Sequence, residues 1–526
     1  MSSQLLSNRY PKPLFVKLLW CGLPLGLGLS LIAMTIFSLS SIQAVSPPMA
    51  LEMEPARPPI SIKPLQVAAQ NSLSVPYLVK DINPNAADSS PSELTAVGNL
   101  LFFTADNGTS GVEIWKSDGT PTGTVMVKDI YVGAVSSGAS RLAAVSNTLF
   151  FRANDSSNGS ELWKSDGTSI GTVMVKDIKY GWDGSSPLNL TAMSDTLFFQ
   201  ANDGSYGYEL WKSDGTPTGT IMVKDIYTGL FSSSPNWLTV MDGILYFRSM
   251  DGDHGNELWK SDGTPTGTIM VKDIHSGTSS STPSYLTAVD DTLYFQANDG
   301  SNGVELWKSD GTPTGTVMVK DIYTGTTGSS PSQMTNMNGT CFFQSTDGVS
   351  GLELWKSDGT PTGTVMVKDI NPGIPDASPY ELTVVSGTLL FRAADGWTGG
   401  AHGGELWKSD GTSTGTVMIT DINPTAFVYP YKLAEVNGTL YFQANNGIYG
   451  YEPWQSDGTP TGTVMIEDIY TGTNGSSPQE FTGVGEAIFF YATDNSHGKE
   501  LWVMGLEPEV IEENYIYLPV ILRSGS

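Results

Sequence analysis

A repeat of about 48 residues constrains the fold of this chain more than any other feature of its sequence. The triplet Glu-Leu-Trp, or a close variant, occurs nine times, and successive tryptophans are 48 residues apart in six of the eight intervals and 52 or 47 apart in the others. A fixed period of this length is typical of a four-stranded β-propeller blade. The nine tryptophans, predicted to be structural anchors, are Trp115, Trp163, Trp211, Trp259, Trp307, Trp355, Trp407, Trp454 and Trp502.

The repeat at residues 285–322 illustrates how each unit is expected to fold. Its segments YLTAV, TLYFQAN, VELWKS and TVMVKDI are short and apolar or alternating, as strands are. Turn segments rich in Asp, Gly and Asn separate them, and no helical periodicity of useful length occurs in the repeats. Each unit is therefore predicted to be a four-stranded antiparallel meander.

The two ends of the repeat array indicate a closed ring. A four-stranded sheet with two apolar faces is stable only when neighbouring sheets cover both of them. The first VKDI motif, at 79–82, is a fourth strand with no first three before it, and the last unit, at 481–502, has three strands and no fourth. We therefore predict an all-β fold, a single nine-bladed β-propeller in which the N-terminal strand completes the last blade. An open superhelix or two smaller propellers is the alternative.

The N-terminal region has the pattern of an export segment. Arg9, Lys12 and Lys17 form a basic start, an apolar stretch runs from Leu18 to about Leu39, and small residues end near Ala44. This pattern predicts a signal peptide, with an uncleaved signal anchor as the alternative because the apolar run is long. The predicted organisation is 1–44 leader, 45–76 Pro/Ser/Ala-rich linker, 77–503 propeller and 504–526 C-terminal tail.

The charge of the chain narrows the choice of partners. The formal net charge is −27, which argues against nucleic acid or an anionic membrane because surfaces that bind phosphates are basic. An extracellular glycan or protein is the expected partner, with membrane contact only through an uncleaved leader. The sequence does not indicate an oligomeric state.

The repeat motif ELWKSDGTPTGTVMVKDI resembles the ELWxxDGT repeat family of exported bacterial proteins, over about residues 77–503 and with eight intact SDGT turns. The resemblance implies a secreted or cell-surface location in a bacterium and a propeller-like fold. It implies no established enzyme activity and no catalytic residues. The SDGT turn is also similar to the Asp-box turn of sialidase propellers, but there the Trp follows the turn, so sialidase chemistry is not carried over.

The aspartates of the SDGT turns are expected to be structural. An Asp that opens a tight turn can accept hydrogen bonds from backbone amides two or three residues further on. Eight copies fit a repeated turn lock better than an active site, which needs one constellation. They are Asp118, Asp166, Asp214, Asp262, Asp310, Asp358, Asp410 and Asp457. The Lys after most of the repeat tryptophans is expected to form exposed cross-strand pairs with acids.

Strand order sorts the loops into two faces. In a meander the SDGT turns share one end of every blade, here called the constant face, and the second-to-third turns and the between-blade segments share the other, here called the variable face. Exposed aromatics beside Asn and Asp suit binding of a carbohydrate or peptide, although they could instead plug gaps between blades. The candidate binding residues in these varied segments are Trp182, Trp237, Trp397, Tyr429 and His402.

One acidic loop is a candidate calcium site. The segment DGDHGNE offers the oxygens of Asp251, Asp253 and Glu257, the ligands that Ca²⁺ prefers, although it lacks full EF-hand spacing. Three histidines, His254, His402 and His497, occupy one turn position before Gly in different repeats, so a shared metal site is not expected. Calcium is therefore a possible cofactor, and a simple turn is the alternative.

The predicted function is that of an exported, non-enzymatic binding or cell-surface interaction module whose variable face contacts the ligand. No GxSxG, HExxH, P-loop or dinucleotide motif occurs, and no catalytic residue is assigned. The alternatives are a polysaccharide-active hydrolase or lyase at the channel mouth and a calcium-dependent structural protein of the cell surface.

Overall fold

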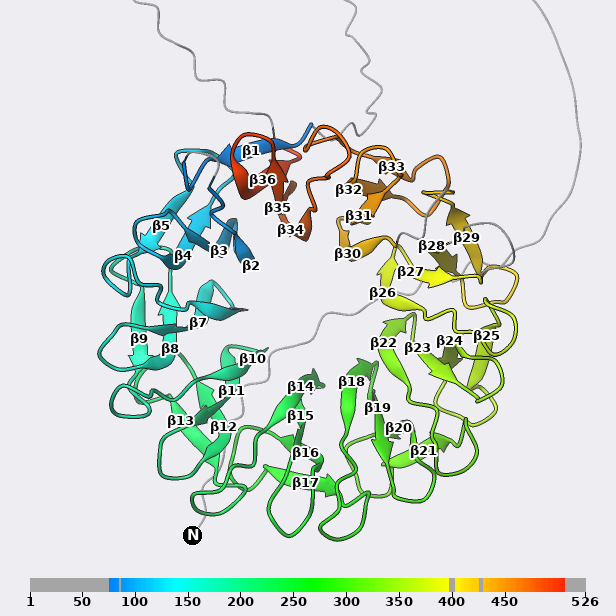
Figure 1. Cartoon of the computed structure of the whole chain (residues 1–526). Coiled ribbons are helices and arrows are strands. Elements are labelled where there is room, and N and C mark those ends of the chain that lie inside the picture. The colour runs from blue at the N-terminus through cyan, green and yellow to red at the C-terminus, as the bar shows by residue number, and fades with distance from the viewer. Residues whose placement is uncertain (1–74, 85–86, 397–402, 425–428, 507–526) are drawn as a thin grey trace, which may run out of the picture. The chain divides into compact units, whose positions relative to one another are not determined.

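The computed structural model describes residues 75–84, 87–396, 403–424 and 429–506. The chain divides into two compact units, Met1–Gln70 and Asn71–Ser526, and every described residue belongs to the second. Within this described part there are 36 strands and no helix, and the strands form nine four-stranded antiparallel sheets around a central channel (Figure 1). The unit is a nine-bladed β-propeller, which confirms the predicted fold class.

Each blade is a meander whose first strand lines the channel and whose fourth strand lies at the rim. The strands of blades 1 to 4, from the channel outward, are β2 (Ser92–Val97), β3 (Leu100–Asp106), β4 (Val112–Ser117), β5 (Val125–Lys128); β6 (Ser140–Val145), β7 (Thr148–Asn154), β8 (Ser160–Ser165), β9 (Val173–Lys176); β10 (Leu188–Met193), β11 (Thr196–Asn202), β12 (Tyr208–Ser213), β13 (Ile221–Lys224); and β14 (Asn236–Met241), β15 (Ile244–Ser249), β16 (Glu257–Ser261), β17 (Ile269–Lys272).

The remaining five blades follow the same plan. Their strands are β18 (Ser284–Val289), β19 (Thr292–Asn298), β20 (Val304–Ser309), β21 (Val317–Lys320); β22 (Ser332–Met337), β23 (Thr340–Thr346), β24 (Leu352–Ser357), β25 (Val365–Lys368); β26 (Tyr380–Val385), β27 (Thr388–Ala394), β28 (Gly404–Ser409), β29 (Val417–Thr420); β30 (Tyr431–Val436), β31 (Thr439–Asn445), β32 (Tyr451–Ser456), β33 (Val464–Met465); and β34 (Gln479–Val484), β35 (Ala487–Asp494), β36 (Gly498–Met504) with β1 (Tyr77–Lys80).

The N-terminal strand closes the ring. Strand β1 pairs antiparallel with β36, with Leu78 opposite Trp502, and the two lie together at the top of Figure 1. Val79 is 1% exposed and packs in a core shared with blade 1. On the channel side, the N–H of Leu94 in blade 1 donates to Glu480 Oε2 in blade 9 at 2.9 Å. The first and last blades are therefore joined at both their outer and inner edges.

Hydrophobic cores lie between neighbouring blades. The core between blades 4 and 5, for example, contains Tyr246 and Leu258 from one sheet and Phe295 and Trp307 from the next. An equivalent cluster occurs at every one of the nine junctions in the described structure. Burying both faces of each sheet in this way is the reason that the blades stack.

Lysines also join the blades. Lys128 Nζ at the end of β5 donates to the carbonyl of Thr172 in blade 2 at 2.8 Å and lies 5.8 Å from the Trp163 ring centroid, within cation–π range. The Lys after a repeat tryptophan reaches the next blade as well, since Lys212 Nζ donates to the carbonyl of Gly263 at 2.8 Å. These lysines therefore bind backbone carbonyls of the neighbouring blade. The sequence led us to expect a cross-strand pair with an acid, but the hydrogen bond of Lys212 is to a carbonyl instead.

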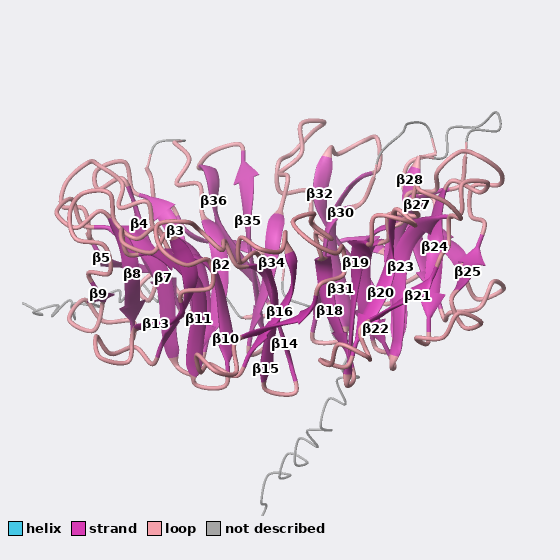
Figure 2. Cartoon of the chain, turned by 90° about the horizontal axis from the view of Figure 1, so that it is seen from below, coloured by secondary structure: helices cyan, strands magenta, loops and turns pink. Residues whose placement is uncertain are grey.

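The SDGT turns have the geometry of a side-chain lock. Asp118 Oδ1 accepts hydrogen bonds from the N–H and hydroxyl of Thr120 at 2.9 and 2.8 Å. Gly123 must lack a side chain, because a Cβ there would overlap the Asp118 carboxylate. In blade 2, the bonds from Thr168 hold the pKa of Asp166 below its ordinary value. Seen from the edge in Figure 2, loops gather at both ends of the blades, and these turns form one of the two sets.

The Glu of each Glu-Leu-Trp triplet holds the between-blade segment in place. Glu209 is fully buried, and its Oε2 accepts bonds from Ile226 N–H at 2.8 Å and Ser233 Oγ at 2.6 Å, while its Oε1 accepts from Ser233 N–H at 2.9 Å. Burial raises the pKa of Glu209 to about 7, because desolvation disfavours the charged form. The nine residues at this position are Glu113, Glu161, Glu209, Glu257, Glu305, Glu353, Glu405, Glu452 and Glu500, all at most 1% exposed.

The leader proposed for 1–44, all of the linker except Val75 and Pro76, and most of the tail lie outside the described residues. Among the described residues, no helix is long and apolar enough to cross a membrane. Cys341, predicted to be a small apolar core residue, is fully buried in β23.

Candidate functional site at the channel mouth

Each of the nine channel-lining strands contains a bulge at its second residue. In β14, Asn236 pairs with Arg248 and Thr239 pairs with Tyr246, so the register shifts between the two pairs, and Trp237 has a φ of +56°. The corresponding residue of every blade has a φ between +55° and +60° although none is glycine. These bulge residues are Glu93, Arg141, Asn189, Trp237, Tyr285, Gln333, Glu381, Lys432 and Glu480.

The bulge residues form a ring at the mouth of the channel on the variable face. They lie at the start of strands that follow the between-blade segments, and those segments belong to the variable face. A left-handed φ in a non-glycine residue is unfavourable and persists only where the surrounding structure enforces it. The backbone is thus the same in nine blades while the side chain changes from one blade to the next, which is typical of positions that carry specificity.

A hollow of about 560 Å³ lies along one arc of this ring. Five consecutive bulge residues line it, from blade 4 to blade 8, and they are joined by the residues that follow them along the inner strands. The bulge residues of this channel-mouth arc are Trp237, Tyr285, Gln333, Glu381 and Lys432, and apolar contacts come from Leu286, Met334, Leu382 and Leu433.

The arc is aromatic at one end and polar at the other. The rings of Trp237 and Tyr285 are 5.0 Å apart between centroids and inclined by 42°, and Trp237 is 41% exposed. Gln333 Oε1 accepts a bond from the N–H of Glu381 at 3.3 Å. Lys432 is exposed and places an ammonium group at the far end. The arrangement can stack against a flat ligand ring and hydrogen-bond its substituents.

The carboxylates of the ring link one blade to the next. Glu381 Oε2 accepts from the N–H of Leu433 at 3.2 Å, and Glu93 Oε2 accepts from the N–H of Leu142 at 3.0 Å. Burial raises the pKa of Glu480, which makes the same contact with blade 1. These acids are therefore engaged in positioning the inner strands.

The structure brings one predicted binding residue into this arc and leaves the others elsewhere. Trp237 lines the hollow, whereas Trp182 lies on the segment between β9 and β10 and is 85% exposed. Tyr429 lies beside Tyr431, with ring centroids 5.9 Å apart, at the start of blade 8. Trp397 and His402 fall outside the described residues.

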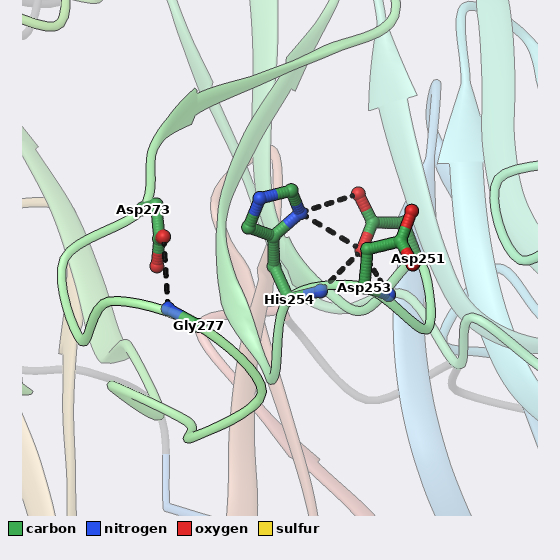
Figure 3. Close-up of polar contacts among 5 residues, drawn as sticks. All are labelled: Asp251, Asp253, His254, Asp273 and Gly277. Carbon is green, nitrogen blue, oxygen red and sulfur yellow. Dashed lines mark hydrogen bonds and ion pairs between the residues drawn. The ribbon is translucent and has the colours of Figure 1, made fainter.

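The candidate calcium ligands are engaged in local contacts. Asp251 accepts bonds from the backbone N–H of His254 at 2.8 Å and of Asp253 at 3.1 Å, and the His254 ring faces it with Nδ1 3.0 Å from Oδ2 (Figure 3). This contact raises the pKa of His254. Glu257 is one of the buried glutamates and accepts from Ile274 N–H and Ser281. No group of three or more metal-binding side chains occurs among the described residues, and calcium at this loop stays a prediction.

Sequence reasoning missed four of the five arc residues: Tyr285, Gln333, Glu381 and Lys432. These four side chains differ in chemistry and lie in segments whose sequence pattern is that of an ordinary strand. The sequence therefore offered no reason to group them. Aligning the repeats on the Pro that stands two residues earlier in eight of the nine blades would have shown one varied position in a near-constant strand.

Comparisons with known proteins show no family for this chain. No protein-family model matches the chain, and no curated protein matches it. Among solved structures, the computationally designed Ika8 protein is similar over 70% of this chain and 97% of its own, at 15% identity and a TM-score of 0.40. A puromycin hydrolase is similar over 80% of this chain at 12% identity and a TM-score of 0.38, and the match covers 61% of the hydrolase. Likenesses this distant say nothing about activity, and the ELWxxDGT resemblance stays a prediction.

Proposed function

We propose that this protein is an exported bacterial binding module that holds an extracellular glycan in the channel-mouth arc. The observation that carries the proposal is the hollow itself, in which the Trp237 and Tyr285 rings lie beside amide, hydroxyl and ammonium groups. Aromatic rings that stack on the apolar face of a sugar, with polar groups around them, are a common way of holding a carbohydrate. The leader and the resemblance stated above support export.

The bulges favour a glycan over a peptide. An extended peptide would bind the inner strands by adding a strand to their free edges. A bulge interrupts the hydrogen-bonding ladder at the mouth end of each of these strands, for example between Ser284 and Thr287 in β18. Side-chain recognition of a non-peptide polymer is therefore the better match to this surface.

The test is binding of the purified full-length chain to a glycan array, with Trp237→Asn as the first variant. Asn189 occupies the same bulge in blade 3 with the same φ of +56°, so asparagine removes the aromatic ring without disturbing the backbone. We expect binding to weaken about tenfold or more, as when an aromatic anchor is truncated. Trp182→Ala is the comparison, because it removes an exposed aromatic from the same face outside the hollow.

Three outcomes separate the alternatives. If Trp182→Ala weakens binding and Trp237→Asn does not, the loop tips are the contact surface and the arc is not. Cleavage of a bound polymer would instead favour the hydrolase or lyase. Loss of binding in the presence of a chelator would favour the calcium-dependent structural role.

A further inference from the structure

An arginine beside the arc is surrounded by tyrosines. At the junction of blades 7 and 8, the Cζ atom of Arg392 in β27 lies 4.7 Å from the ring centroid of Tyr380, 5.2 Å from that of Tyr429 and 4.6 Å from that of Tyr431. These distances are within cation–π range. The Tyr431 ring also contacts Tyr451, with centroids 6.0 Å apart. We call Arg392 with its three neighbouring tyrosines the Arg392 cage.

The charge of Arg392 has no carboxylate partner within the described part of the chain. The ion pairs there join Lys179 to Asp183, and His254 and His497 to their neighbouring aspartates. The Nε atom of Arg392 is buried and has no hydrogen-bond partner, as is also true of Arg152 and Arg248. Arg392 as a whole is half-buried, and its contacts with tyrosine rings set it apart from those two arginines.

The cage is continuous with the hollow. Tyr380 and Tyr431 are the first residues of β26 and β30, and the residues that directly follow them, Glu381 and Lys432, line the hollow. Lys432 therefore lines the end of the arc opposite Trp237 and Tyr285, and Arg392 lies one strand further out, in β27, against the tyrosines that precede the lining residues.

The cage is specific to this junction. Arg152 and Arg248 occupy the same register position in blades 2 and 4, where they pair with Ser140 and Asn236 in place of a tyrosine. The residue that corresponds to Tyr431 is Leu188 beside blade 2 and Ser284 beside blade 4, and Arg248 Nη1 donates to Ser284 Oγ at 3.3 Å. The repeat does not require tyrosines around this arginine.

We infer that Arg392 and Lys432 form an anion subsite of the arc, so that the glycan this protein binds is an acidic one that carries carboxylates, such as a uronate polymer. The inference rests on the proposed function and names its ligand class. A guanidinium that lies against aromatic rings can still bind a carboxylate through its N–H groups. At about 0.15 M salt the screening length is about 8 Å, so a bound sugar is affected mainly by the charges around the hollow. These are the two cations and the Glu381 carboxylate, which accepts a bond from the N–H of Leu433.

The test compares two polymers that differ only in charge. Wild-type protein is run through native gels that contain polygalacturonate or its fully methyl-esterified, neutral form. We expect about tenfold tighter retention by polygalacturonate. Arg392→Gln should reduce that retention several-fold and leave retention by the neutral polymer unchanged. Lys432→Gln, in the arc itself, should reduce retention by polygalacturonate by a larger factor than retention by the neutral polymer. Arg392→Lys should keep part of the preference, and Arg152→Gln, the matched arginine without a cage, should keep all of it.

Each outcome supports or overturns the inference. Equal retention by the two polymers, or a preference that survives both Gln variants, overturns the anion subsite and leaves the glycan function standing. Retention by neither polymer also overturns the inference, and the glycan array then tests the proposed function by itself. Retention of poly-L-glutamate as tight as that of polygalacturonate shows recognition of charge on any chain and overturns it too. Lys432 is exposed, so Lys432→Gln still tests the subsite if Arg392→Gln fails to fold.

Discussion

At the residue scale, the Glu of the Glu-Leu-Trp triplet is the least expected contributor to the fold. It is an acidic residue next to an apolar pair, and sequence reasoning assigned it no role in the fold and singled out only Glu257, as a candidate calcium ligand. In the structure it is buried and satisfied by backbone and hydroxyl donors of the between-blade segment. The role of the SDGT aspartates could be predicted from the local sequence, because their hydrogen-bond donors lie two residues away. The donors to Glu209 lie 17 and 24 residues away, and only the folded blade brings them together.

Replacing a buried glutamate by glutamine should destabilise the propeller. In Glu209→Gln the amide nitrogen cannot accept a bond, so at least one buried donor loses its partner, which costs about 1–3 kcal/mol. We expect a lower melting temperature by circular dichroism. Glu486→Gln, at an exposed turn on the constant face, is the control and should melt like wild type. Equal melting of the two variants would mean that these carboxylates do not hold the between-blade segments.

At the scale of the element, the strands were predictable and the bulges were not. The predicted segments YLTAV, TLYFQAN, VELWKS and TVMVKDI correspond closely to β18, β19, β20 and β21. Alternation and turn residues are local signals. The bulge has no such signal, because residues such as Tyr285 and Gln333 do not favour a positive φ, and tertiary packing imposes the conformation.

The bulge conformation should carry a measurable strain. Arg141 is exposed and has a φ of +60°, so Arg141→Gly should relieve the strain and raise stability by about 0.5–1 kcal/mol after the entropy lost by glycine on folding. Arg141→Ala retains a Cβ and should gain nothing. Thermal melting of the pair measures the difference, and identical melting of the glycine and alanine variants would show that the bulge is unstrained.

At the scale of the whole molecule, ring closure depends on a strand far from its partners in sequence. Val79 in β1 packs against blade 1 as Val127 in β5 packs against blade 2. Val79→Asp should therefore lower the melting temperature about as much as Val127→Asp, because both bury an unpaired charge. A Val79→Asp protein that melts near wild type while Val127→Asp does not would show that the ring does not need β1.

The stability of the ring should also fall as pH rises above about 5. Burial raises the pKa of Glu209, Glu452 and Glu500 to about 7 and of Glu353 to about 8. A raised folded pKa means that the folded state binds more protons, so this contribution is full below about pH 4.5 and is lost as pH rises through 7 to 8. We expect a higher melting temperature at pH 5 than at pH 8. The Glu353→Gln variant should reduce this difference, and a melting temperature that rises with pH over this range would contradict the assignment.

The role of the channel-mouth arc is tested most directly by hydrogen exchange of the full-length protein with and without an oligogalacturonate. We predict slower exchange, on binding, of the amides at the mouth ends of β14, β18, β22, β26 and β30, the strands that line the hollow. The segments between β9 and β10 and between β13 and β14 should exchange as in the free protein. Protection confined to those segments, with the five inner strands unchanged, would contradict the account.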